Sequence, residues 1–283
     1  MHDVTPPRLR PAPVGPARIA WVVGVYGPTL VAVGAAFVQD LRLAALAVVA
    51  LAVIALRFRR SSLAPAWAAP IPILATFAWG VTVSPIAEGG PFDCAGPASL
   101  PALARAAEAG LGVALIVLMG RWLGVAAAVE GVRRPSRRVG AVSVALLVLG
   151  APLSIVAFGA LARPFLGDFV IAAPLPAVLL PAAVFALANG VLEEAVYRGA
   201  MQGWSGLAVG GRVAIVLQAA VYGAAHSGPG FVASPLPAVV ALFLLGCAAG
   251  LIVRRTGSLL PTIAVHVALD VPLYLFIACR LTP

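Results

Sequence analysis

Long apolar stretches separated by short polar segments make up most of this chain. Many approach 20 residues, the length that an α-helix needs to cross a bilayer. We expect helical spans at residues 18–38, 41–56, 67–87, 109–129, 139–160, 175–200, 211–226, 235–253 and 258–279. Segments of about ten alternating residues, which are typical of a transmembrane barrel, do not occur. The pattern predicts an all-α, polytopic transmembrane helical bundle. The second and seventh segments are short for a full crossing, so about eight to nine spans are expected.

The composition excludes a soluble globular fold. Hydrophobic residues make up 62% of the 283 positions and charged residues only 10%, whereas soluble domains carry about 25% charged residues. The mean hydropathy is +1.05. Both values fit an integral membrane protein, and we expect it in the plasma membrane.

Every basic residue apart from histidine is an arginine, and the distribution of the arginines along the chain predicts the orientation of the protein in the membrane. The formal net charge of +9 would suggest nucleic acid as the partner of a soluble protein. Here most arginines lie in short segments between apolar spans, so they are read as topology signals and no nucleic-acid partner is expected. Twelve lie on one predicted side, in segments 1–18, 57–66, 130–138 and 254–257. The opposite loops contain only four, namely Arg42, Arg105, Arg163 and Arg280. The bias predicts a cytoplasmic N-terminus.

Three regions are expected along the chain. Residues 1–17 are rich in proline and arginine and predict a mobile cytoplasmic N-terminus. Residues 18–173 form a transmembrane scaffold of about five spans that is nearly free of ionisable groups. Residues 174–279 hold the last four spans and almost all of the intramembrane charges. The catalytic core is therefore expected in these four helices.

The ionisable residues of this last region are spaced as helical pairs. They are Glu193, Glu194, Arg198, His226, His266 and Asp270. A charge inside a membrane is costly unless it is paired or solvated, so intramembrane charges commonly mark a functional site. Glu194 and Arg198 stand at i and i+4, which favours an ion pair on one helix face. Tyr222 with His226 and His266 with Asp270 repeat this spacing on two further helices.

Such a set suits the hydrolysis of a peptide bond. That reaction needs a base that activates water, a group that stabilises the oxyanion and an acid for the leaving amine. Glu193 fits the base, because it has no partner in its own helix. The same chemistry leaves open a divalent metal such as zinc, bound by Glu193, His226 and His266. No HExxH motif occurs, so a metal site would need ligands from three helices.

Three motifs carry a resemblance to a known family. EEAVYRG at 193–199, YGAAH at 222–226 and HVALD at 266–270 resemble the motifs of the CPBP intramembrane proteases. That family includes CAAX-prenyl proteases, bacteriocin-processing enzymes and abortive-infection-like proteins. The resemblance implies that Glu193 and His226 activate water and that Glu194 and Arg198 shape the site. It also implies that His266 and its i+4 partner stabilise the oxyanion.

This chain departs from the family pattern at two positions. Tyr222 replaces the usual Phe and adds a hydroxyl group. Asp270 stands where some members have Asn, and an ionised Asp accepts hydrogen bonds but cannot donate one to an oxyanion. The sequence therefore leaves three alternatives open for Asp270. It is protonated, it orients His266, or it helps to hold a metal.

The function expected from these observations is an intramembrane endopeptidase. Its substrate is expected to be a membrane-associated peptide or protein, prenylated or bacteriocin-like, that enters from the cytoplasmic side. Two other classes remain open. Buried Glu, His and Asp side chains also serve in transporters and proton relays, although no internal repeat is visible. A non-catalytic immunity or scaffold protein could retain the same fold.

Overall fold

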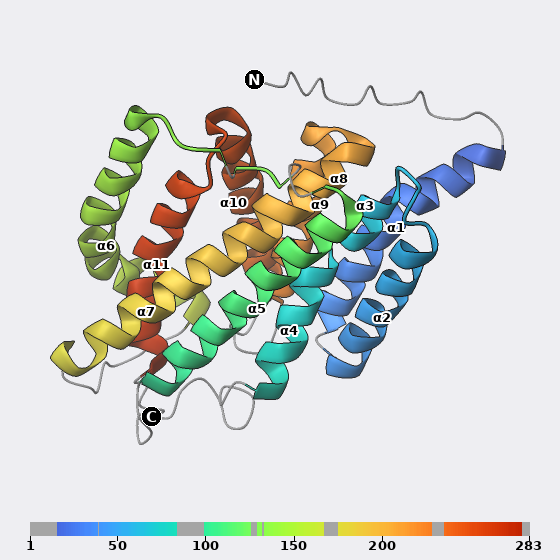
Figure 1. Cartoon of the computed structure of the whole chain (residues 1–283). Helices are drawn as coiled ribbons and strands as arrows, with labels where there is room; N and C mark the ends of the chain where they lie inside the picture. The colour runs from blue at the N-terminus through green and yellow to red at the C-terminus, as the bar shows by residue number, and fades with distance from the viewer. Residues whose placement is uncertain are drawn as a thin grey trace.

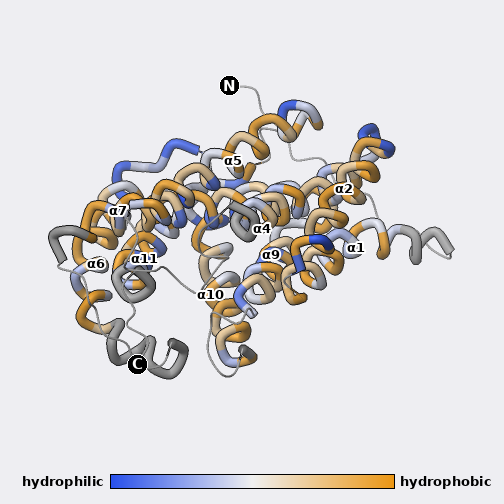
Figure 2. Tube along the Cα trace, turned by 90° about the horizontal axis from the view of Figure 1, so that it is seen from below, coloured by the Kyte–Doolittle hydropathy of each residue, from blue (hydrophilic) through white to orange (hydrophobic). Residues whose placement is uncertain are grey.

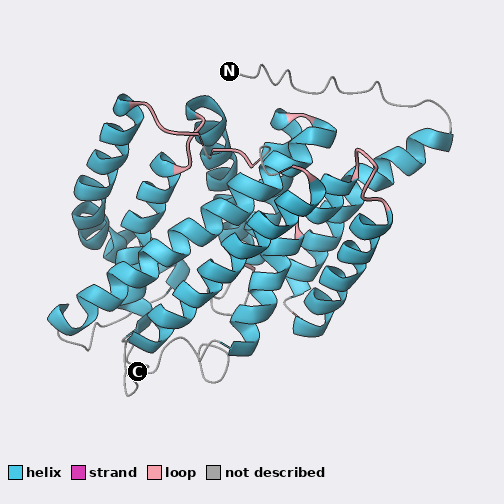
Figure 3. Cartoon of the chain, viewed as in Figure 1, coloured by secondary structure: helices cyan, strands magenta, loops and turns pink. Residues whose placement is uncertain are grey.

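The computed structural model describes residues 16–38, 40–83, 99–125, 129–131, 133–166, 175–227 and 235–278. These residues form helices joined by short loops, with no strand among them (Figure 3). Each of the nine predicted segments contains a helix, so the predicted all-α bundle is confirmed for the described residues. Most of the predicted N-terminal segment lies outside them.

The helices follow one another in this order: α1 (Pro16–Val38), α2 (Leu41–Arg57), α3 (Ala64–Ala68), α4 (Ile71–Val83), α5 (Ser99–Leu123), α6 (Arg137–Leu166), α7 (Leu175–Glu193), the π-helix η3 (Glu194–Met201), α8 (Gln202–Val209), α9 (Gly211–Ala225), α10 (Pro235–Thr256) and α11 (Leu260–Ala278). Figure 1 shows α7 crossing the molecule, with α6 and α11 on one side and α1 and α2 on the other.

Five of the described helical segments are long and apolar enough to cross a membrane. They are Trp21–Val38, Ser99–Leu123, Arg137–Ala157, Val178–Val209 and Leu236–Thr256. The helices α2 and α9 are shorter, as expected from the sequence. Hydrophobic residues run along most of the helices (Figure 2). Large apolar side chains such as Leu149 and Val156 are strongly exposed, as expected for a surface in contact with lipid.

Three predicted boundaries were wrong. The span expected at 109–129 begins instead at Ser99 and ends at Leu123, so Arg105 and Glu108 lie inside a helix rather than in a loop. The segment expected at 67–87 divides into α3 and α4 around Ala69 and Pro70. The segment expected at 175–200 continues through η3 and α8 to Val209.

A glycine ends this long segment. Gly210 follows α8 with φ +81°, a left-handed conformation that disfavours residues with a side chain. The chain therefore turns back at once, and α9 begins at Gly211. This tight turn brings α9 back beside α8 and η3.

Glycines also let helices approach one another closely around the polar residues. A Cβ atom at Gly190 of α7 would lie 3.0 Å from Val267 Cγ2 and 3.5 Å from His266 Cβ. The backbones of α7 and α11 are therefore close beside the glutamate pair. Small residues commonly permit such contacts between membrane helices.

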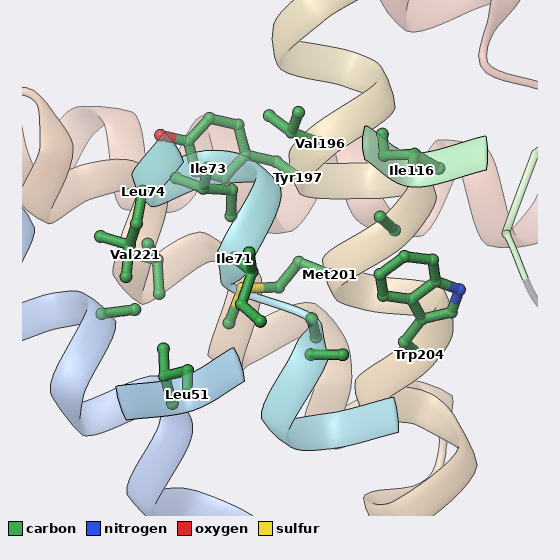
Figure 4. Packing of buried hydrophobic residues seen from close by; sticks show 14 of the residues in the cluster. Leu51, Ile71, Ile73, Leu74, Ile116, Val196, Tyr197, Met201, Trp204 and Val221 are labelled. Carbon is green, nitrogen blue, oxygen red and sulfur yellow. The ribbon is translucent and has the colours of Figure 1, made fainter. Parts of the chain in front are cut away.

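The apolar core packs against the face of η3 and α8 that the polar residues leave uncovered. Val196, Tyr197, Met201 and Trp204 contribute to this core from η3 and α8. They are joined by Leu51 of α2, Ile71, Ile73 and Leu74 of α4, Ile116 of α5 and Val221 of α9 (Figure 4). Trp204 and Met201 are fully buried. The N-terminal helices thus hold the segment that carries the first motif.

Replacing Gly223 by Ala is expected to lower the free energy of unfolding by about 1–3 kcal/mol, the usual cost of overpacking. The added Cβ would lie 2.8 Å from the backbone oxygen of Val239, so α9 and α10 would have to move apart. Gly110 is the matched control, because a Cβ there meets nothing within 4 Å. Thermal unfolding in detergent should show a lower Tm for Gly223→Ala and no loss for Gly110→Ala. Equal Tm values would contradict the helix contact.

Candidate active site

The polar residues of the last region lie around the junction of α7 and η3, where α7 packs against α11 and η3 packs against α9. The π-helix begins directly after Glu193, so Glu193 ends α7 and Glu194 starts η3. π-Helical turns inside α-helices are rare and often occur at functional sites. Seven of the eight residues of η3 are buried. The first motif is therefore held on a distorted helical turn in the protein interior.

His266 of α11 is the central side chain of this cluster, because it contacts three carboxylates. Its Nδ1 lies 3.1 Å from Glu194 Oε1, within hydrogen-bonding distance. Its Nε2 lies 3.5 Å from Glu193 Oε2 and 3.6 Å from Asp270 Oδ2. Glu193 and His266 retain 14% and 12% side-chain exposure, so this pair is less deeply buried than Glu194 and Arg198, which are 2% exposed.

Glu194 and Arg198 form a fully buried ion pair. Arg198 Nη1 lies 3.2 Å from Glu194 Oε1, and each side chain is only 2% exposed. The guanidinium also stands 4.1 Å from the centre of the Tyr222 ring, which is a cation–π contact. The predicted i, i+4 pair is thus present, although the helical turn that carries it is a π-helix.

His226 lies at the C-terminal end of α9 and faces the same cluster. Its Nδ1 lies 2.7 Å from the backbone oxygen of Tyr222. A carbonyl oxygen can only accept, so Nδ1 donates and Nε2 is the acceptor nitrogen of the neutral ring. The His226 ring packs edge-on against Tyr222 at 4.7 Å, and His226 interacts electrostatically with Glu193.

Asp270 is tied to α7 by a contact between distant parts of the chain. Asn189 Nδ2 donates a hydrogen bond of 2.8 Å to Asp270 Oδ2, and both residues are buried. The same oxygen is the one nearest to His266 Nε2. Asp270 thus accepts a hydrogen bond from Asn189 and lies beside the His266 ring, and its role stays a prediction.

All six predicted site residues come together, but sequence reasoning missed a second charged pair. Arg105 and Glu108 of α5 form an ion pair with 2.6 Å between Nη1 and Oε2. Arg105 also interacts electrostatically with Glu193 and Asp270. The i, i+3 spacing of the two residues within an apolar stretch could have indicated this pair. The sequence prediction assigned that stretch to a loop.

A short segment of the loop between α5 and α6 crosses the end of η3. Glu130 donates its backbone N–H to the Gly199 oxygen at 3.1 Å, and Leu259 donates to the Gly131 oxygen at 3.1 Å. The Glu130 carboxylate accepts from the side-chain amide of Gln202. This segment links η3 to the turn before α11, and therefore helps to fix the two elements that carry Glu194 and His266.

Glu130 is expected to make stability depend on pH. Partial burial raises the pKa of Glu130 above its ordinary value of 4.5, outweighing the Gln202 hydrogen bond and the attraction of Arg254. As the pH rises through 4.5 the unfolded chain loses its proton first, so the folded state loses stability until Glu130 is ionised there too. Glu130→Gln should match the wild-type Tm at low pH and exceed it at pH 8. A lower Tm for the variant at pH 8 would refute this.

A metal ion was one of the possibilities left open by the sequence, with Glu193, His226 and His266 as ligands. Within the described residues, no group of three or more His, Cys, Asp and Glu side chains is arranged to hold a metal ion. Both ring nitrogens of His266 contact carboxylates instead. The side chains as they stand do not fit a metal centre, and the metal-assisted route remains an untested prediction.

The fold and the site together define a helical membrane protein with a buried Glu, His and Asp cluster. Residues 174–272 match the family model of the Rce1-like type II CAAX prenyl endopeptidases. This segment contains all three motifs, so the resemblance to the CPBP and CAAX protease family is confirmed for it. No curated protein and no solved structure gives a significant match to the chain.

Proposed function

We propose that this protein is an intramembrane endopeptidase that hydrolyses a peptide bond in a membrane-associated peptide or protein. The observation that carries the proposal is the cluster around His266, in which Glu193, Glu194 and Asp270 surround one imidazole. It lies inside the segment that matches a family of endopeptidases. A structural ion-pair network alone would not need Glu193 and His266 to remain partly exposed.

In the proposed reaction Glu193 acts as the general base. It takes a proton from water, with His226 Nε2 accepting a hydrogen bond from the same water molecule, and the hydroxide attacks the carbonyl carbon. His266 Nε2–H donates to the oxyanion that forms. When the carbon–nitrogen bond breaks, Glu193 returns its proton to the leaving amine.

Glu194, Arg198 and Asp270 act as positioning residues in this scheme. Glu194 holds Nδ1 of His266, while Asp270 lies beside Nε2 of the same ring and is itself held by Asn189. Arg198 neutralises Glu194 at 2% exposure, where an unpaired carboxylate would be costly. In this role Asp270 does not donate a hydrogen bond to the oxyanion. An ionised Asp can therefore stand at the position where some family members have Asn.

Purified protein in liposomes tests the proposal. We expect it to cleave a peptide anchored in the same bilayer, and prenylated and acylated versions of that peptide will show whether a prenyl group is needed. Proton and solute flux into the same liposomes is measured in parallel. Flux that depends on Glu193, without any peptide cleavage, would instead support a transporter.

Chelation separates the two routes to an activated water. If the side chains act alone, preincubation with a strong zinc chelator should leave the cleavage rate unchanged within a factor of about two. A loss that added zinc restores would show the metal-assisted route. The control is the same treatment followed by gel filtration, which excludes loss through aggregation.

A further inference from the structure

Positive charge is concentrated at the turn after α2. Arg57, Arg59 and Arg60 stand within four residues of one another, and each of them is exposed. Among the described residues, no carboxylate forms an ion pair with any of these arginines. Figure 1 shows this turn at the same end of the molecule as the turn between α8 and α9. One end of the helical bundle therefore carries a cluster of arginines without an internal counter-ion.

The three arginines line a common hollow. It has a volume of about 400 Å³ and is bounded by the consecutive residues from Leu56 to Ser61. Ligand sites commonly measure about 300–1,000 Å³. The Arg57 guanidinium stands 5.6 Å from the centre of the Phe58 ring, a cation–π contact that helps to hold it in place. Guanidinium groups bind phosphate oxygens through paired, charge-assisted hydrogen bonds, so a phosphate group suits this hollow.

The surface beside the hollow is apolar. Val49, Val53 and Leu56 lie on one face of α2, because they are spaced four and three residues apart. Each of these side chains is more than half exposed, as is Phe58 at the hollow itself. A free phosphate ion would leave this face uncovered, whereas the acyl chains of a phospholipid would pack along it. The hollow and the face of α2 together match the two parts of one lipid molecule.

We propose that the turn between α2 and α3 binds the phosphate group of an anionic phospholipid, whose acyl chains lie along the exposed face of α2. Arginine clusters next to membrane helices commonly attract anionic lipids. The arginine bias of the sequence places this turn on the predicted cytoplasmic side, where anionic lipids give the membrane surface its negative potential. The lipid takes no part in the proposed hydrolysis, so this inference does not depend on the protease activity.

A lipid bound at this turn would stabilise the fold. The turn leads into α3, whose residues Ala64, Pro65, Ala66 and Ala68 are buried. The helix α3 packs against α8, which continues directly from η3. A ligand that binds only the folded turn adds its binding free energy to the stability of the native state. An anionic phospholipid should therefore raise the Tm in detergent more than a zwitterionic phospholipid with the same acyl chains, and equal Tm values would contradict the proposal.

Titration of the purified chain in a zwitterionic detergent, followed by native mass spectrometry, tests the proposal. The probes are phosphatidylglycerol, phosphatidylcholine with the same acyl chains, and glycerol phosphate, which has the headgroup without the chains. We expect phosphatidylglycerol to bind about tenfold more tightly than phosphatidylcholine, because only the former carries a net negative charge. Glycerol phosphate should bind at least about a hundredfold more weakly than phosphatidylglycerol, since it buries no acyl chain. Equal affinity for the two lipids would overturn the proposal without any variant, and equal affinity for glycerol phosphate would show a phosphate site instead of a lipid site.

Arg59→Gln combined with Arg60→Gln should remove the preference for phosphatidylglycerol and leave the affinity for phosphatidylcholine unchanged. Arg137→Gln combined with Arg138→Gln is the matched control. It removes the same charge from two exposed arginines at the start of α6, which do not line the hollow, and it should retain the preference. Equal losses in the two double variants would reduce the effect to net charge and overturn the defined site. Displacement of bound phosphatidylglycerol by an acidic peptide at equal concentration would also overturn the proposal, because a protein segment would then be the better occupant.

Discussion

Glu193→Gln is expected to lower the kcat of peptide cleavage by about a thousandfold or more. Glutamine has the shape of glutamate but cannot take a proton from water, and the loss of a general base commonly costs about 10²–10⁴-fold. The amide can still occupy the position 3.5 Å from His266 Nε2, so the fold should survive. Single-turnover cleavage of a bilayer-anchored peptide, with Tm measured on the same samples, checks both points.

The matched control is the same acid-to-amide change at a distant site. Asp40 caps the N-terminus of α2 through hydrogen bonds to Arg42 N and Leu43 N, and asparagine caps helices equally well. Asp40→Asn should therefore cleave at the wild-type rate. A wild-type cleavage rate in Glu193→Gln would show that Glu193 is not the general base.

The helical pairs of the site were predictable because their spacing is local. An i, i+4 relation fixes neighbours on one helix face, which is why the contacts Glu194–Arg198, Tyr222–His226 and His266–Asp270 all appear. The apolar segments were predictable for a similar reason, because each must cover a bilayer by itself. Each expected segment therefore contains a helix in the same order, although the segment at 67–87 divides into two helices.

Contacts between helices were less accessible to sequence reasoning. The hydrogen bond from Asn189 to Asp270 joins residues 81 positions apart, and no pattern in either helix specifies it. The start of α5 was misplaced because Arg105 and Glu108 looked like loop residues, whereas each neutralises the other within the helix. The π-helical turn that begins at Glu194 packs against α4, α5 and α9, and no local spacing reveals these contacts.

Arg198→Ala is expected to lower the free energy of unfolding by about 3–5 kcal/mol. The change takes away the arginine partner of Glu194 at 2% exposure and leaves only the His266 ring beside its charge, and removing one partner of a buried ion pair costs about that much. The cation–π contact with Tyr222 is lost as well. Cleavage should fall with stability, because Glu194 loses the contact that fixes its carboxylate beside His266 Nδ1. Chemical denaturation in detergent measures the first effect and peptide cleavage the second.

A double variant separates stability from positioning. Glu194→Gln combined with Arg198→Gln removes both buried charges, so much of the lost stability should return, since a buried ion pair adds little net stability to a protein. Activity should not return, because the neutral amide that replaces the Glu194 carboxylate holds Nδ1 of His266 more weakly than the carboxylate did. Recovery of both stability and activity would make the pair purely structural. Recovery of stability alone would identify Glu194 as the residue through which Arg198 acts on His266.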